Sequence, residues 1–310
     1  MTSLIMPPAP VQPAIAFEPA AIQAMLLNLQ APCYVVRLNG QVGLSNQPVD
    51  SAETLALLPP TPPEQLGDPQ FRQFHGLRYA YATGAMAGGI ASADLVIAMG
   101  QAGLLGSFGA GGVPPQRLEA ALQQVQQALP QGPYAFNLIH NPAEPLMERG
   151  AVDLFLKYGV KTIEASAFLA LTANIVYYRA AGLSLGADGQ IQIGHRVIAK
   201  LSRREVAAQF MQPAPAKFLK ELVEQGLITE LQAQLAARVP MADDITVEAD
   251  SGGHTDNRPL VSLLPSIIGL RDEIQAQYQY PHLIRVGAAG GIATPESALA
   301  AFMMGAAYVV

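Results

Sequence analysis

The chain has 310 residues, of which 50% are hydrophobic and 14% are charged, and its mean hydropathy is +0.24. Its formal net charge of −6 excludes a broadly basic nucleic-acid-binding surface, and its single cysteine, Cys33, excludes a disulfide framework and a cysteine-based metal centre. We interpret Cys33 as a small half-buried residue. So few charges favour a parallel α/β fold, because helices then cover both faces of the strands.

The N-terminal sequence shows no secretory signal, because residues 1–13 are rich in proline and have no basic segment. Only Asp94 is charged between Arg78 and Arg117, but glycines interrupt this stretch, and no apolar run reaches the ~18 residues of a membrane span. We therefore expect buried strand, loop and helix there, and a cytoplasmic protein without a membrane segment.

Residues 1–70 are distinguished by paired prolines, at 7–8, 59–60 and 62–63. Between them, short apolar runs flank Asn39-Gly40, a dipeptide that is typical of two-residue hairpin turns. We predict a small N-terminal β-containing module over this region, followed by a proline-rich linker.

From about residue 76 the sequence alternates between β-rich and helical segments. Ser92 is a predicted helix cap, and Pro114 opens a helix that runs to Leu129. The predicted strands lie at residues 79–86, 104–108, 134–139, 160–165, 197–200, 245–249, 283–288 and 306–310. This alternation predicts a (β/α)8 TIM barrel over residues 71–310, with a doubly wound open sheet as the rival fold.

Two insertions interrupt the predicted barrel. Residues 182–195 contain an Asp188-Gly189 turn between short β-like runs, and residues 214–239, after the fifth strand, predict two amphipathic helices. The sequence ends at Val310 inside an apolar strand, without an eighth helix. We expect from this pattern that the C-terminal end is truncated.

A glycine pair follows the seventh predicted strand. Gly290 and Gly291 precede Thr294, a predicted helix cap, and Pro295, a favoured first helical residue. Backbone N–H groups at glycines and at a helix N-terminus can bind an anion, and barrels commonly bind phosphate in the loops after strands seven and eight. This pattern predicts a phosphate site, and the alternative is a tight turn without a ligand.

Residues 248–259 follow the sixth strand with a run of polar residues and glycines. Gly252 and Gly253 permit close contact with a planar ring, and His254 is a candidate proton donor because the ordinary pKa of histidine lies near neutrality. The alternative is a solvent-exposed turn.

The loop after the first strand holds Ala85, Met86, Ala87 and Gly88, which are small residues apart from Met86. Such a loop suits a flavin ring lying on backbone atoms, and close helix packing is the alternative. The nearby run 109–112 lacks the third glycine of a dinucleotide-binding fingerprint.

Two polar residues lie towards the carboxyl ends of buried strands, where barrel active sites gather: Asn137 is near the end of the third, and Lys200 ends the fifth. A helix cap or a snorkelling surface residue is the alternative for each. We interpret His75, His195 and His282 as structural, and His140 as structural but close to the same end of the barrel.

These motifs, in this order, resemble the trans-acting FMN-dependent enoyl reductase family of polyketide and polyunsaturated fatty acid synthases. That family lies within the nitronate monooxygenase (2-nitropropane dioxygenase-like) superfamily. The resemblance covers residues 34–310, and its most specific motif is the run 248–259, Glu-Ala-Asp-Ser-Gly-Gly-His-Thr-Asp-Asn-Arg-Pro.

The resemblance implies FMN at the barrel mouth and NADPH as the hydride source. The substrate would be an α,β-unsaturated thioester on an acyl carrier protein, with the α-proton coming from His254, Lys200 or water. The implied FMN contacts are Ala85, Met86, Ala87, Gly88, Asn137, Lys200, Gly252, Gly253, Gly290 and Gly291. The family continues past Val310 with a segment that completes the phosphate site, so we expect weakened FMN binding by this chain.

Three alternatives stay open at this point: a nitronate monooxygenase-like oxidoreductase, a non-catalytic assembly component of a synthase, and a flavin-free phosphate-binding barrel. A homo-oligomer is compatible with the sequence. Five basic residues cluster in sequence near the second insertion and form a candidate docking patch for an acidic carrier protein, with a solvated helix face as the alternative: Lys200, Arg203, Arg204, Lys217 and Lys220.

Overall fold

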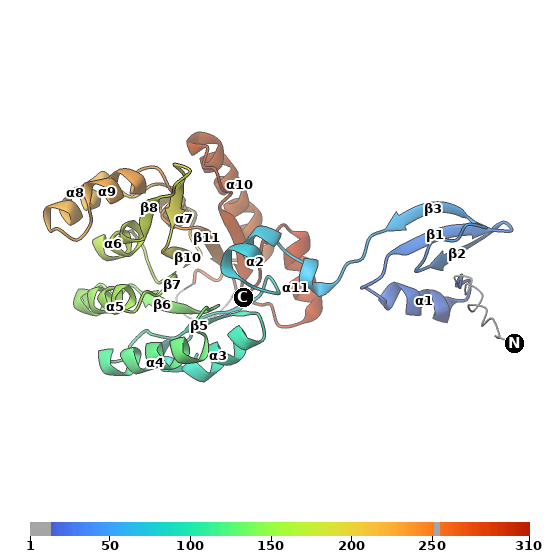
Figure 1. Cartoon of the computed structure of the whole chain (residues 1–310), viewed down its shortest axis with the longest axis horizontal. Coiled ribbons are helices and arrows are strands. Elements are labelled where there is room, and N and C mark those ends of the chain that lie inside the picture. The colour runs from blue at the N-terminus through green and yellow to red at the C-terminus, as the bar shows by residue number, and fades with distance from the viewer. Residues whose placement is uncertain (1–13, 251–254) are drawn as a thin grey trace, which may run out of the picture. The chain divides into compact units, whose positions relative to one another are not determined.

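The computed structural model describes residues 14–250 and 255–310 (Figure 1). Contacts between Cα atoms divide the chain into two compact units, with the boundary between Leu66 and Gly67.

The first unit is a three-stranded antiparallel sheet with one helix. Its elements are α1 (Pro19–Leu27), β1 (Cys33–Leu38), β2 (Gln41–Ser45) and β3 (Glu53–Leu58), with strand order β2-β1-β3. The predicted hairpin is confirmed: Leu38 pairs with Gln41, and Asn39 and Gly40 both have positive φ. Two such residues form the turn whose twist matches the flanking strands. Cys33 is 6% exposed and is therefore more deeply buried than the half-buried position expected from the sequence. A short 3₁₀ helix, η1 (Pro63–Gln65), follows.

The second unit contains a parallel sheet of seven strands in the order β12-β11-β10-β7-β6-β5-β4. These strands are β4 (Ala82–Thr83), β5 (Leu105–Phe108), β6 (Ala135–Ile139), β7 (Thr162–Ser166), β10 (Arg196–Leu201), β11 (Asp244–Glu248) and β12 (Arg285–Ala289). Each lies at a predicted position. The first is shorter than predicted, because its residues from Gly84 onward leave the sheet and enter the loop that precedes the next helix.

The predicted eighth run closes the ring. Val309 forms parallel bridges with both Tyr81, beside β4, and Ala288, in β12. The two edge strands of the sheet are therefore joined through residues 307–310, as in a barrel and not as in a doubly wound open sheet. The barrel prediction is confirmed.

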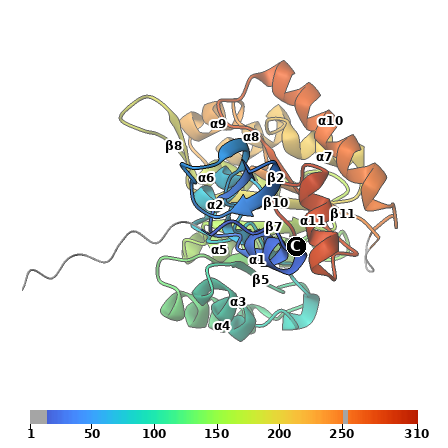
Figure 2. The same cartoon turned by 90° about the vertical axis from the view of Figure 1, so that its right-hand side faces the viewer.

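Helices pack around the strands (Figures 1 and 2). They are α3 (Ala93–Gln101), α4 (Pro115–Ala128), α5 (Pro145–Lys157), α6 (Ala173–Ala181), α7 (Arg204–Met211), α10 (Leu260–Tyr278) and α11 (Pro295–Met303). Local signals explain their starts, since the Ser92 hydroxyl accepts from the Leu95 amide and Pro115 occupies the first turn of α4.

Both insertions also form as predicted. The first is the hairpin β8 (Leu183–Leu185) and β9 (Ile191–Ile193), and the second is the helix pair α8 (Ala216–Glu224) and α9 (Glu230–Ala236).

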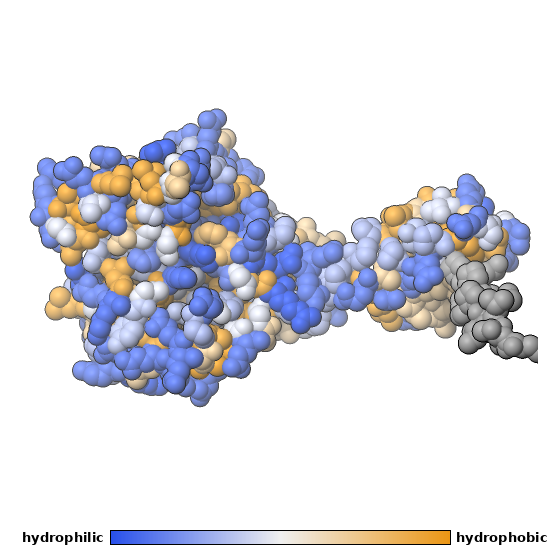
Figure 3. All heavy atoms as spheres, viewed as in Figure 1, coloured by the Kyte–Doolittle hydropathy of each residue, from blue (hydrophilic) through white to orange (hydrophobic). Residues whose placement is uncertain are grey.

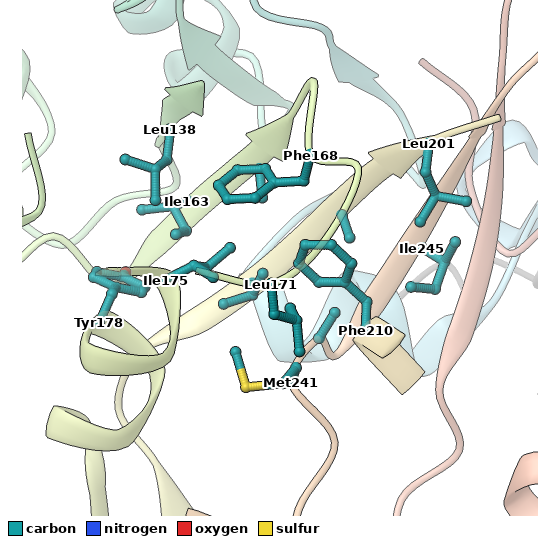
Figure 4. Packing of buried hydrophobic residues seen from close by; sticks show 14 of the residues in the cluster. Leu138, Ile163, Phe168, Leu171, Ile175, Tyr178, Leu201, Phe210, Met241 and Ile245 are labelled. Atoms are coloured by element: carbon teal, nitrogen blue, oxygen red, sulfur yellow. The ribbon is translucent and has the colours of Figure 1, made fainter. Parts of the chain in front are cut away.

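The main core lies between the strands and their covering helices (Figure 4). Side chains from β6, β7, β10 and β11 meet side chains from α6 and α7 there, and those labelled in the figure are Leu138, Ile163, Phe168, Leu171, Ile175, Tyr178, Leu201, Phe210, Met241 and Ile245. Burial of this apolar surface is the main stabilising contribution to the fold.

A short helix, α2 (Pro69–His75), closes the amino-terminal end of the strands. The ring of Phe71 stacks on that of Tyr308 at 4.0 Å, inside the barrel. His75 Nε2 lies 2.8 Å from Asp244 Oδ2, and Arg285 Nε donates to Asp244 Oδ1 at 2.6 Å. Asp244 and Arg285 begin β11 and β12, so this polar cluster marks the end of the barrel opposite the carboxyl ends of the strands.

The stretch between Arg78 and Arg117 forms β4, α3, β5 and the start of α4, as predicted. Over residues 14–250 and 255–310, no helix is both long enough and apolar enough to cross a bilayer. Hydrophobic residues on the face shown in Figure 3 are interspersed with hydrophilic ones.

Candidate active site

Lys200 lies between two buried carboxylates at the carboxyl ends of the strands. Its Nζ atom is 3.1 Å from Glu248 Oε1 on β11 and 3.4 Å from Glu164 Oε1 on β7. The Lys200 side chain is 10% exposed, and the two carboxylate side chains are 5% and 8% exposed. A buried ammonium flanked by carboxylates is a costly arrangement that is tolerated only when its partners are well placed.

The electrostatics of this cluster favour a charged lysine. Burial opposes the charge of Lys200, yet the carboxylates of Glu164 and Glu248 together raise its pKa above the ordinary value. Burial raises the pKa of Glu164, although Lys200 and the amide of Ala85 act in the opposite direction. A raised pKa makes Lys200 a weak acid at neutral pH. Lys200 is therefore suited to holding a fixed positive charge and less suited to donating a proton.

The predicted flavin loop is connected to this cluster. The amide of Ala85 donates to Glu164 Oε1 at 3.0 Å. Beyond it, Met86 and Gly88 are exposed, and Gly88 has a φ of 68° within the short helix η2 (Ala87–Gly89). A Cβ atom at Gly88 would meet nothing within 4 Å. The loop therefore presents backbone and a small side-chain surface at the mouth of the barrel.

The neighbouring glycine run supports this loop. Gly88 N donates to Gly111 O at 2.7 Å, and Gly89 N donates to Gly109 O at 2.9 Å. A Cβ atom at Gly109 would lie 1.6 Å from Met86 O, so only glycine permits this approach. The run at 109–112, which the sequence left without a clear role, thus packs against the loop.

Asn137 is buried in the middle of β6, where it pairs with Glu164 on the neighbouring strand β7. Its Nδ2 atom donates to the carbonyl oxygen of Glu164 at 2.9 Å and to Ser166 Oγ at 2.7 Å. The side chain is thereby fixed against β7. Asn137, Lys200 and Ala85 all lie around Glu164, so three of the predicted site residues come together at the barrel mouth.

The glycine pair after β12 has two distinct environments. A Cβ atom at Gly290, where φ is 94°, would lie 1.8 Å from the carbonyl oxygen of Ala249. At Gly291, where φ is 69°, it would meet nothing within 4 Å. Thr294 caps α11 as predicted, by accepting from the Ser297 amide at 3.2 Å. Gly290 therefore packs against the end of β11, and Gly291 borders open space near a helix N-terminus.

Gly252, Gly253 and His254 lie outside the described residues. The polar segment after them is bonded to the loop that follows β10. Asp256 accepts from Arg203 Nε at 3.0 Å and from Ser202 Oγ at 3.1 Å. These hydrogen bonds, chiefly that of Arg203, lower the pKa of Asp256.

The five basic residues of the candidate docking patch do not form one exposed surface. Lys200 is buried in the barrel, Arg203 binds Asp256, and Arg204 donates to Glu273 and to Ser266 O. On α8, Lys220 Nζ lies 3.8 Å from Glu224 Oε1, beside the exposed Glu221. The patch hypothesis was therefore wrong for Lys200, which is buried. Arg203, Arg204 and Lys220 each lie beside an acidic residue, and a docking role for Lys217 and Lys220 on α8 stays a prediction.

Two functional candidates were missed from the sequence. Glu164 and Glu148 are charged residues that are 4% and 3% exposed. Glu164 lies between Ile163 and Ala165 in a predicted buried strand, which is a signal that could have identified it, since a charge is rarely buried without a partner. Glu148 lies in the first turn of α5 and binds His140. The hydrophobic pattern of this helix gave no signal that Glu148 is buried.

Comparison with known proteins gives two family matches. Residues 72–310 match the nitronate monooxygenase family, and residues 11–60 match the N-terminal domain of the fatty acid synthase subunit PfaD. Among relatives, the chain is 49% identical to one of the polyunsaturated fatty acid synthase subunits of a Thraustochytrium species, over 98% of this chain. It is 46% identical to the polyketide biosynthesis protein PksE of Bacillus subtilis, over 80% of this chain.

A solved structure is similar over the same region. The enoyl reductase domain of MlnA, from the macrolactin biosynthesis cluster of Bacillus amyloliquefaciens, is 42% identical with a TM-score of 0.77, over 80% of this chain and 56% of that one. The chain spans 20% of the length of the Thraustochytrium protein and 32% of PksE. Because the family match covers most of its length and the structure is the expected barrel, the chain belongs to the nitronate monooxygenase family. Residues 11–60, which precede the barrel in the sequence, match the PfaD N-terminal domain.

Proposed function

We propose that the chain is a trans-acting enoyl reductase that uses FMN and NADPH to reduce α,β-unsaturated acyl thioesters on an acyl carrier protein. It would act in the cytoplasm as a component of a polyunsaturated fatty acid or polyketide synthase. The observation that carries this proposal is the 42% identity to the MlnA enoyl reductase domain over 80% of the chain. Family membership supports the broader class, an FMN-dependent oxidoreductase.

The residues at the barrel mouth fit FMN. The exposed backbone of the 86–88 loop and the open space beside Gly88 and Gly291 leave room for a flat ring and for a phosphate. The buried hydroxyls of Thr83 and Ser107 have no hydrogen-bond partner in the part of the chain that the structure describes. Unsatisfied buried polar atoms are uncommon in proteins and are consistent with a site that a ligand completes.

When bound, FMN would supply the hydride chemistry between NADPH and the β-carbon of the thioester. Lys200, Asn137 and the exposed backbone of residues 86–88 would lie against the ring, and Gly291 with the N-terminus of α11 would hold the phosphate. Lys200 keeps its proton because two carboxylates stabilise the ammonium. We therefore assign the α-proton to His254, and we assign Lys200 the electrostatic role.

The test is a pair of assays on the purified chain, with the MlnA enoyl reductase domain as the positive control. FMN binding is measured by fluorescence quenching, and turnover by NADPH oxidation with an enoyl-pantetheine thioester. We expect saturable FMN binding and thioester-dependent NADPH oxidation that is lost in His254→Gln. A protein that binds FMN but consumes oxygen with an alkyl nitronate, and leaves the thioester unreduced, has the nitronate monooxygenase activity of its family name. Absence of FMN binding both by this chain and by a chain extended at its C-terminus with the corresponding segment of the MlnA domain would contradict the flavoenzyme proposal.

A further inference from the structure

Glu164 connects two parts of the candidate site that are far apart in sequence. Its Oε1 atom accepts the Ala85 amide at 3.0 Å and lies 3.4 Å from Lys200 Nζ. One carboxylate oxygen on β7 thus binds both the loop after β4 and the cation at the end of β10. The side chain is 5% exposed, so water competes little for either contact.

The loop backbone lies directly against the cation. A Cβ atom at Gly84 would be 3.1 Å from Lys200 Nζ. With the Ala85 amide bonded to Glu164, the chain therefore passes over the ammonium with little spare room. A movement of Lys200 would displace the backbone that leads into residues 85–88.

The two carboxylates around Lys200 are not equivalent. Glu248 approaches the ammonium from β11 at 3.1 Å, but the Ala85 amide is bonded to Glu164. Both carboxylates contribute negative charge to the cluster, and Glu164 in addition anchors the loop. This difference makes Glu248 a matched control for the charge of Glu164.

We propose that Glu164 is a positioning residue, which holds the 85–88 loop and the Lys200 ammonium in one arrangement before the flavin binds. The inference rests on the proposed function, since it assigns the loop and the lysine to the flavin. It predicts that the geometry needed for binding is set by the protein and not created by the cofactor. Preorganisation of this kind reduces the ordering cost of binding.

The test compares wild type with Glu164→Leu, Glu164→Gln and Glu248→Gln. Hydrogen–deuterium exchange of the peptide covering residues 84–90 is measured on the flavin-free chain. We expect faster exchange in Glu164→Leu, which has no acceptor for the Ala85 amide. Wild-type exchange is expected in Glu164→Gln, whose carbonyl oxygen can accept the same hydrogen bond, and in Glu248→Gln.

FMN binding and the midpoint potential of the bound flavin complete the test. Glu164→Leu should weaken FMN binding by on the order of tenfold, from the loss of a hydrogen bond to a charged acceptor, and Glu164→Gln should restore most of it. Both glutamine variants should shift the midpoint potential to more positive values, because each removes a negative charge close to the flavin. The shift reports the charge that the two carboxylates share, whereas rescue of loop exchange and FMN affinity by Glu164→Gln, after their loss in Glu164→Leu, reports the positioning role.

The outcomes separate the two proposals. Wild-type exchange and wild-type FMN affinity in Glu164→Leu would overturn the positioning role while leaving the flavoenzyme intact. Absence of FMN binding by both the wild-type chain and its C-terminally extended form would overturn the proposed function, and the exchange experiment would still decide whether Glu164 orders the loop. If Glu164→Leu does not fold, Glu164→Ala takes its place, and wild-type exchange of residues 84–90 together with wild-type FMN affinity in that variant overturns the proposal.

Discussion

His140 Nδ1 lies 2.8 Å from Glu148 Oε2, and the Glu148 side chain is 2% exposed. The other oxygen of Glu148 accepts the hydroxyl of Thr172, the residue that caps α6. The ring of Phe168 stacks on His140 at 5.2 Å. One carboxylate in the first turn of α5 therefore joins the end of β6 to the start of α6. This arrangement supports the interpretation of His140 as a structural residue near the barrel mouth.

We predict that Glu148→Leu destabilises the chain by about 1–3 kcal/mol, because it leaves the partly buried donors of His140 and Thr172 without an acceptor. The measurement is the free energy of unfolding from urea denaturation. Glu144→Gln, in the exposed turn before α5, is the matched control and should change stability by less than about 0.5 kcal/mol. Equal effects of the two substitutions would contradict the role of Glu148.

Lys200→Met should destabilise the protein by about 3–5 kcal/mol at neutral pH, because it leaves two buried carboxylates without their cation. Without the ammonium, which lowers the pKa of Glu164, that pKa should rise further. The variant should therefore recover stability relative to wild type as pH falls and the carboxylates take up protons. Urea denaturation of both proteins between pH 5 and pH 8 tests this, and a stability difference that is independent of pH would refute it.

Asp244 should make the barrel sensitive to acid. Burial opposes the charge of Asp244, yet Arg285 and His75 together lower its pKa below the ordinary value. A lowered pKa means that the stabilisation is present above the unfolded-state pKa of about 4 and is lost as pH falls through the folded-state value. Asp244→Asn should cost about 3 kcal/mol at pH 7 and should flatten the loss of stability below about pH 4. Urea denaturation across this pH range measures both effects.

The glycines after β12 should respond differently to the same substitution. Gly290→Ala should impair folding, since its Cβ atom would lie 1.8 Å from Ala249 O. Gly291→Ala has open space and should cost only about 1 kcal/mol, from its positive φ. If the phosphate of FMN binds here, Gly291→Ala should still weaken FMN affinity severalfold. Thermal unfolding and FMN titration separate the two effects, and an unchanged FMN affinity in a folded Gly291→Ala protein would place the phosphate elsewhere.

The strand positions and both insertions follow from local signals. Asn39-Gly40 predicted its turn, Ser92 its helix, and each β-rich run its strand, because these features depend on neighbours in sequence. The polar clusters could not be predicted in the same way. Glu164 contacts Ala85 and Lys200 only because the closed barrel brings three strand ends together. No spacing in the sequence predicts these contacts.

The basic residues near α8 show the reverse error. Their proximity in sequence suggested a common surface, but Arg203 and Arg204 bind acidic residues, Asp256 and Glu273, that come more than fifty positions later. The clustering of basic residues in the sequence was therefore a poor guide to a basic surface, because the fold determines which acidic residues lie beside them.

The helix α2, which closes the amino-terminal end of the barrel, is synthesised early, whereas the residues that it packs against are synthesised late. His75 in α2 precedes Asp244 by 169 positions, and Phe71 stacks on Tyr308. During synthesis, the buried face of α2 has these packing partners only after nearly the whole barrel has been synthesised. Long-range contacts of this kind slow folding. On the ribosome, Phe71 and His75 would therefore lack these partners until β11 and residues 306–310 have been synthesised.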